Sequence, residues 1–185
     1  MRATQRLTAS QGALLVIDLQ EKLVAAVADG SRVAANAVRL VRGARVLGVP
    51  AQATEQYPKG LGPTVAALAE LLPDRPPKTT FACSSLPSVL EQFYGRQVRH
   101  VTLAGVEAHV CVAQTALELM ELGFRVQVVA DAVGSRDPFD RDVALRRLET
   151  AGAAISTTEA VLFEWCETAD RPEFKAISAL VKERV

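Results

Sequence analysis

The stretch ALLVI at residues 13–17, followed directly by Asp18, decides the fold. A short, unbroken apolar run is typical of a strand covered on both faces, as in a parallel sheet. Further strands are predicted where similar runs or β-favouring residues recur between turn signals. These predicted strands lie at residues 50–54, 78–82, 98–104, 125–130 and 153–156.

Helical patterns separate these strands. Residues 31–47 repeat apolar side chains every three or four positions, with Ser31 as the expected N-cap and Gly48 closing the helix. Asp137 and Pro138 are the N-cap and first position of another predicted helix, which ends near Ala151. We expect further helices at residues 65–71, 111–122, 158–163 and 173–181, and a loop at 55–63.

This alternation predicts a single α/β domain over residues 1–185. We expect a three-layer, doubly wound sheet of about six mainly parallel strands, with helices on both faces. Ligands of such folds bind beyond the carboxyl ends of the strands. Asp18, Cys111 and Asp131 each follow a predicted strand and should lie at that edge.

The composition excludes several classes of protein. Lys and Arg number 21, as do Asp and Glu, and no basic stretch is present, which argues against nucleic-acid binding. No apolar run approaches membrane-spanning length, and MRATQRLTAS at residues 1–10 lacks the apolar core of a signal peptide. The 3 cysteines are scattered, which favours a reducing compartment. We therefore expect a cytoplasmic protein.

Three side chains are candidates for chemistry. Cys111 begins a predicted helix, where the helix dipole favours thiolate, although a buried cysteine is often inert. Asp18 could act as a general base or only cap a turn, and Lys78 could pair with it or be solvated. Cys83 and Cys166 lack such settings, and we interpret them as structural.

Several motifs resemble the isochorismatase-like hydrolase superfamily, and within it the isochorismatase domain-containing proteins. They are VIDLQ at 16–20, TEQYPKGLGPT at 54–64, KTTF at 78–81, GVEAHVC at 105–111 and VVADAVGSR at 128–136. The resemblance runs in register over nearly the whole chain. It implies that the catalytic triad of the family falls on Asp18, Lys78 and Cys111.

The resemblance also implies a cis peptide between Val106 and Glu107, and an oxyanion hole formed by the backbone amides of Glu107 and Cys111. Asp131 is expected to cap a turn or to pair with an arginine such as Arg136, rather than to act as a third catalytic carboxylate. Five further side chains are candidates for the pocket wall: Gln20, Leu23, Tyr57, Phe81 and His109.

Two departures from relatives in the superfamily narrow the chemistry. Nicotinamidases carry metal-binding histidines after the second strand, whereas the only two histidines here are His100, interpreted as structural, and His109. We therefore expect no metal and no cofactor. Enzymes that cleave isochorismate lack the nucleophilic cysteine, so Cys111 indicates acyl transfer instead.

The sequence thus predicts a metal-independent cysteine hydrolase that cleaves an amide or imide C–N bond of a small-molecule substrate through a thioester on Cys111. Asp18 would be the base and acid, and Lys78 the orienting cation. The alternatives are a catalytically silent binding or scaffold protein and a peroxide-sensitive redox protein. We also expect a homo-oligomer, for which the apolar stretches AVLFEW and FKAISALV could supply an interface.

Overall fold

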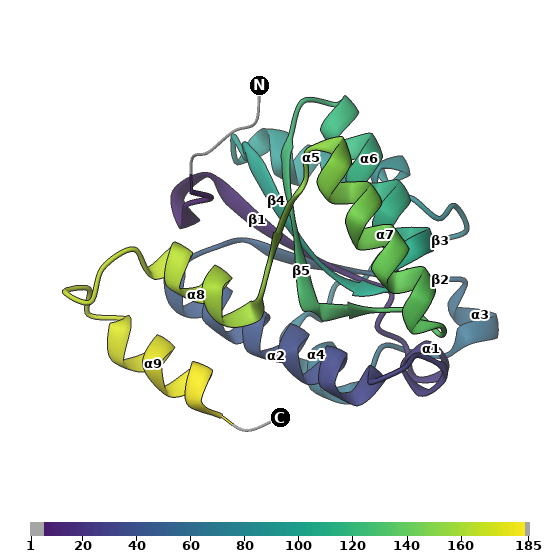
Figure 1. Ribbon diagram of the computed structural model, residues 1–185, viewed down its shortest axis with the longest axis horizontal. Coiled ribbons are helices and arrows are strands. Elements are labelled where there is room, and N and C mark those ends of the chain that lie inside the picture. Colours follow the sequence, from purple (N-terminus) through teal and green to yellow (C-terminus); the bar gives the residue numbers. More distant parts are fainter. Residues whose placement is uncertain (1–5, 184–185) are drawn as a thin grey trace.

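The computed structural model describes residues 6–183. Residues 1–5 and 184–185 lie outside this range. Residues 1–5 are half of the N-terminal stretch, residues 1–10, in which no signal peptide is expected. Six parallel strands form one sheet in the order β3-β2-β1-β4-β5-β6, with helices on both faces (Figure 1). This confirms the predicted doubly wound α/β fold. The strands are β1 (Gly12–Ile17), β2 (Ala51–Gln56), β3 (Pro77–Lys78), β4 (His100–Val106), β5 (Arg125–Gly134) and β6 (Ala154–Ser156).

Two apolar layers sandwich the sheet. Alternate residues of β1 explain the unbroken apolar run, since Leu14 and Val16 face one layer while Leu15 and Ile17 face the other. The first layer packs under α2 (Gly30–Leu47), α4 (Ala66–Leu71), α8 (Thr158–Cys166) and α9 (Phe174–Lys182). The second packs under α5 (Pro87–Gly95), α6 (Ala113–Glu121) and α7 (Pro138–Ala151) (Figure 1).

The order of the strands reverses between β1 and β4. In doubly wound sheets this is the point where a crevice opens beyond the carboxyl ends of the strands. The two strands approach closely there, because a Cβ at Gly105 would lie 2.1 Å from the backbone oxygen of Ile17. Glycine is therefore required at this position, where φ is also +130°.

Several predicted boundaries were wrong. The strand expected at residues 78–82 ends at Lys78, after which the chain turns around the lysine ammonium. The fifth strand is longer than expected because its pairing with β4 contains a bulge, where the register shifts between Leu103 and Gly105. The expected loop at 55–63 instead extends β2 and includes α3 (Pro58–Leu61).

Helix starts were predicted with mixed success. The Asp137 carboxylate accepts a hydrogen bond from the Phe139 amide at the start of α7, as predicted. By contrast, Asp29 and not Ser31 precedes the first residue of α2. The sequence analysis missed α1 (Glu21–Ala26), α5 and the short turns η1 (Ala9–Gln11) and η2 (Cys83–Ser85).

The apolar C-terminal stretches are only partly buried. Leu162, Trp165 and Ile177 are fully buried against the chain's own core, whereas Phe163 is 38% exposed. The suggestion that these stretches supply an interface therefore stays a prediction, and it concerns only their exposed side chains. Within residues 6–183, no helix combines the length and the apolar character needed to cross a membrane.

Candidate active site

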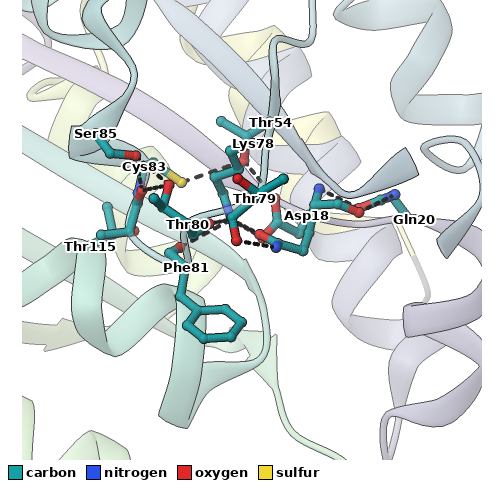
Figure 2. A network of polar contacts seen from close by, with 12 residues as sticks. Asp18, Gln20, Thr54, Lys78, Thr79, Thr80, Phe81, Cys83, Ser85 and Thr115 are labelled. Carbon is teal, nitrogen blue, oxygen red and sulfur yellow. Dashed lines mark hydrogen bonds and ion pairs between the residues drawn. The ribbon is translucent and has the colours of Figure 1, made fainter. Parts of the chain in front are cut away.

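The structure brings Asp18 and Lys78 into direct contact at the carboxyl end of the sheet. Asp18 follows β1, and Lys78 ends β3 on the far side of β2. The Lys78 ammonium lies 2.6 Å from Oδ2 of Asp18, and both side chains are almost completely buried. Figure 2 shows the two side chains pointing toward each other. Because charges are costly to bury without a partner, each stabilises the charged form of the other.

The Asp18 carboxylate has three neighbours. Its Oδ1 accepts a hydrogen bond of 2.8 Å from the Thr54 hydroxyl, while Oδ2 accepts one from Lys78. Cys111 lies close enough for the charge of this carboxylate to act on its thiol. The backbone of Asp18 has a φ of +53°, which turns the chain out of the sheet at this point. The carboxylate is thus held by a hydroxyl and a cation, with the thiol nearby.

Lys78 is surrounded by oxygen atoms. Besides Asp18, its ammonium contacts Oε1 of Gln56 at 2.7 Å and the carbonyl oxygens of Phe81 at 3.0 Å and Thr80 at 3.3 Å. Burial opposes the charged form and is the largest single effect, but the charge and hydrogen bond of Asp18 and the two nearby thiols together outweigh it and raise the pKa of Lys78. Lys78 is therefore a fixed cation at neutral pH.

Cys111 lies in the π-helical turn η3 (Ala108–Val112), directly before α6, and is 6% exposed. Burial, and after it the charge of Asp18, raise the pKa of the thiol to about 12, while Lys78 acts in the opposite direction. The expectation that the helix start would favour thiolate was therefore wrong. The resting thiol keeps its proton.

Cys83 also belongs to this cluster, which the sequence analysis did not predict. Its sulfur lies 3.5 Å from the Thr54 hydroxyl that bonds to Asp18, and its amide donates to the Thr115 hydroxyl at 3.0 Å. Burial, followed by the Asp18 charge, raises the pKa of the Cys83 thiol to about 11. The chain turns tightly after Lys78, so that Cys83, five residues later, lies beside the same cluster of side chains (Figure 2).

The loop before Cys111 has an unusual backbone. The peptide bond between Val106 and Glu107 is cis. The Glu107 carboxylate accepts hydrogen bonds from the backbone and side-chain nitrogens of Arg136, at 2.9 and 3.0 Å. The suggested pairing of Asp131 with Arg136 was therefore wrong. Asp131 instead accepts hydrogen bonds from the amide and hydroxyl of Thr158, at the start of α8.

A cavity of about 570 Å³ borders Lys78. Of the five candidates for the pocket wall, Tyr57 lines this cavity and is 54% exposed. Asp18 and Cys111 are not in its wall, so the cavity reaches the cluster only at the lysine. Its lining residues are Tyr57, Pro58, Lys59, Pro77, Lys78, Thr79, Thr80, Ser85 and Leu86.

The other four candidates lie in different settings. Gln20 is fully buried, and its amide bonds to the backbone of Gln56. Leu23 packs against the core layer beneath α2. Phe81 is half-exposed, and Nδ1 of His109 lies 2.9 Å from the Ser135 hydroxyl.

The remaining histidine lies at the other end of the sheet. His100 begins β4, and its Nε2 lies 2.6 Å from the carbonyl oxygen of Thr8. Burial lowers the pKa of this imidazole. Within residues 6–183, no three His, Cys, Asp or Glu side chains are grouped so that they could hold a metal ion.

The fold and site together define a doubly wound α/β protein with a cysteine, an aspartate and a lysine gathered at the carboxyl end of the sheet. The family model for the isochorismatase domain matches residues 12–160, and the chain belongs to this family. It is 40% identical over 183 residues to isochorismatase domain-containing protein 2 of Danio rerio, covering 98% of this chain and 92% of that protein.

Two solved structures are also similar. A Caenorhabditis elegans protein described as MAR1 ribonuclease is 40% identical with a TM-score of 0.90, covering 97% of this chain and 93% of that one. The YcaC gene product of Escherichia coli, described as an octameric hydrolase of unknown specificity, is 26% identical with a TM-score of 0.88. The latter match covers 97% of this chain and 92% of that chain.

Proposed function

We propose that this protein is a metal-independent cysteine hydrolase that cleaves a C–N bond of a small amide or imide through a thioester on Cys111. One observation carries the proposal: a buried thiol lies close enough to feel the charge of a buried carboxylate, and a buried ammonium lies 2.6 Å from the same carboxylate. A nucleophile next to a base, with the base oriented by a third group, is the usual arrangement for acyl transfer.

Asp18 is the general base in this mechanism. Because the pKa of the Cys111 thiol is raised to about 12, little thiolate forms before the substrate binds. The proton therefore moves to Asp18 as the sulfur attacks the carbonyl carbon. Lys78 stays charged throughout and holds the carboxylate in position through Oδ2.

In this proposal the backbone amides of Glu107 and Cys111 stabilise the tetrahedral oxyanion; the cis peptide before Glu107 and the turn that contains Cys111 support this assignment. In other enzymes, removing one such donor costs about 3 kcal/mol of transition-state stabilisation. Collapse of the intermediate breaks the C–N bond, and Asp18 returns its proton to the leaving amine. Asp18 then activates water, which hydrolyses the thioester and restores the thiol.

The substrate is a small molecule in this proposal. The cavity beside Lys78 is of the size that small ligands occupy. Although the similar C. elegans protein is described as a ribonuclease, this chain has no net charge and no basic stretch to bind phosphates. The octameric E. coli protein supports a homo-oligomer here as well.

The test is a panel of small amides and imides, with intact-mass detection of a thioester on Cys111. We expect Cys111→Ala to abolish both turnover and the adduct. Cys166→Ala is the matched control, because Cys166 is also buried but belongs to the other core layer, where its thiol donates to the carbonyl of Thr168. Turnover by Cys111→Ala at the wild-type rate would refute the proposal. If the protein cleaves RNA and this cleavage survives Cys111→Ala, the RNA is cleaved at a different site.

The alternatives of a silent binding protein and a redox protein lead to different results. A thiol that reacts slowly with alkylating agents at neutral pH does not favour the binding protein, because burial already keeps Cys111 protonated. The absence of turnover and adduct on every substrate would favour it. Peroxide consumption without hydrolysis would favour the redox protein.

A further inference from the structure

The Gln20 side chain lies just beyond the end of β1 and is hydrogen-bonded to the end of β2. Its Oε1 accepts a hydrogen bond of 2.7 Å from the amide of Gln56, and its Nε2 donates to the carbonyl oxygen of Gln56 at 3.1 Å. The same Nε2 donates to the carbonyl of Gly62 at 2.6 Å. Backbone pairing between β1 and β2 ends at Ile17 and Thr54, so the Gln20 amide takes the place of a further peptide unit.

Gln56 makes the next contact in the series. It pairs with Lys78 in the register of β2 and β3, which places the two side chains next to each other. Its Oε1 accepts a hydrogen bond of 2.7 Å from the Lys78 ammonium. Its Nε2 donates to the carbonyl of Thr79 at 3.0 Å, in the turn whose next carbonyls also bind the ammonium.

We propose that Gln20 and Gln56 are positioning residues: Gln20 fixes the backbone of Gln56, and the Gln56 amide holds the Lys78 ammonium against Asp18. A lysine side chain is long and flexible, so its ammonium stays at one carboxylate oxygen only if other acceptors fix it. Among the oxygen atoms that bind the Lys78 ammonium, the Gln56 amide oxygen is the one that a substitution can remove without changing the charge of the site. The expected change in kcat rests on the proposed function, whereas the expected change in the reactivity of the Cys111 thiol does not.

The experiment measures the rate of Cys111 alkylation by iodoacetamide at neutral pH, with Cys111→Ala as the blank for Cys83 and Cys166. Gln56→Leu removes the acceptor and leaves both backbone bonds from Gln20 intact. Because Lys78 favours the thiolate, a displaced ammonium should slow this alkylation by about three- to tenfold. On an active substrate, kcat should fall about tenfold with KM little changed.

Gln20→Leu should shift both quantities in the same direction by a smaller amount, since it acts through the backbone of Gln56. If Gln20→Leu does not fold, Gln20→Met serves instead, because it also removes these hydrogen bonds and keeps the charge and the approximate size of the side chain. Gln114→Leu, an exposed position on α6, is the matched control and should change neither quantity.

A lower melting temperature for Gln56→Leu with an unchanged alkylation rate would overturn the proposal and leave Gln56 a purely structural residue. Slower alkylation with Gln56→Leu and no change with the Gln20 variants would overturn the role of Gln20. The proposed function fails by a separate result, namely hydrolysis that survives Cys111→Ala. The two failures are therefore distinguishable.

Discussion

The two ends of the parallel sheet bury titratable side chains in different ways. At the amino end, His100 is buried, and its ring contacts a backbone carbonyl. At the carboxyl end, an aspartate, a lysine and two thiols lie close together, and the pKa values of the lysine and of both thiols are shifted by their neighbours. An isolated buried group with a backbone partner serves the fold. A buried cluster whose charges act on one another is a candidate for chemistry.

The largest expected effect comes from breaking the buried ion pair. Lys78→Met should leave the Asp18 charge without its cation, abolish turnover and lower the free energy of unfolding by about 3–5 kcal/mol. Urea unfolding measures the change in stability. Arg42→Met is the matched control, because its pair with Glu183 is 44% exposed on each side and should contribute less than about 1 kcal/mol. Equal losses in the two variants would contradict the account.

A smaller effect is expected at Asp131, a second carboxylate toward the carboxyl end of the sheet. Asp131→Ala should lower the free energy of unfolding by about 1–2 kcal/mol, since Asp131 caps the start of α8 through Thr158. The pH dependence of Cys111 alkylation should stay unchanged. A shifted profile would mean that Asp131 belongs to the reactive cluster and that the contrast with Asp18 is wrong.

The smallest effect concerns the amino end. Because burial lowers the pKa of His100, the folded state binds a proton less readily than the unfolded state does. The stability that this group contributes is therefore present above its unfolded pKa of about 6.5 and is lost as the pH falls toward the folded value. His100→Gln should reduce the fall in melting temperature between about pH 7.5 and about pH 5.5. An identical fall in both proteins would contradict this interpretation.

The sequence predicted the sheet well where local pattern and burial agree. The residues of β1 are apolar because helices cover both faces, and such a run can be read without knowing the rest of the chain. The start of α7 was equally readable, since Asp137 and Pro138 form a local signal. Pro87, at the first turn of α5, was a signal of the same kind that the analysis missed.

The candidate site was only partly predictable. Asp18 and Cys111 follow strands that are neighbours in the sheet, so the topology alone brings them together. The end of β3 depends on carbonyls that turn around the Lys78 ammonium, and the position of Cys83 depends on that turn. The protonated state of Cys111 depends on burial and on the Asp18 charge, neither of which a helix start reveals.

The most direct test of the central claim is the rate of Cys111 alkylation at neutral pH in Asp18→Asn, compared with the wild type. The claim is that the Asp18 charge helps to keep the thiol protonated, so removing that charge while Lys78 remains should favour the thiolate. We predict that alkylation at neutral pH becomes about tenfold faster. A rate that is unchanged or slower would contradict the claim.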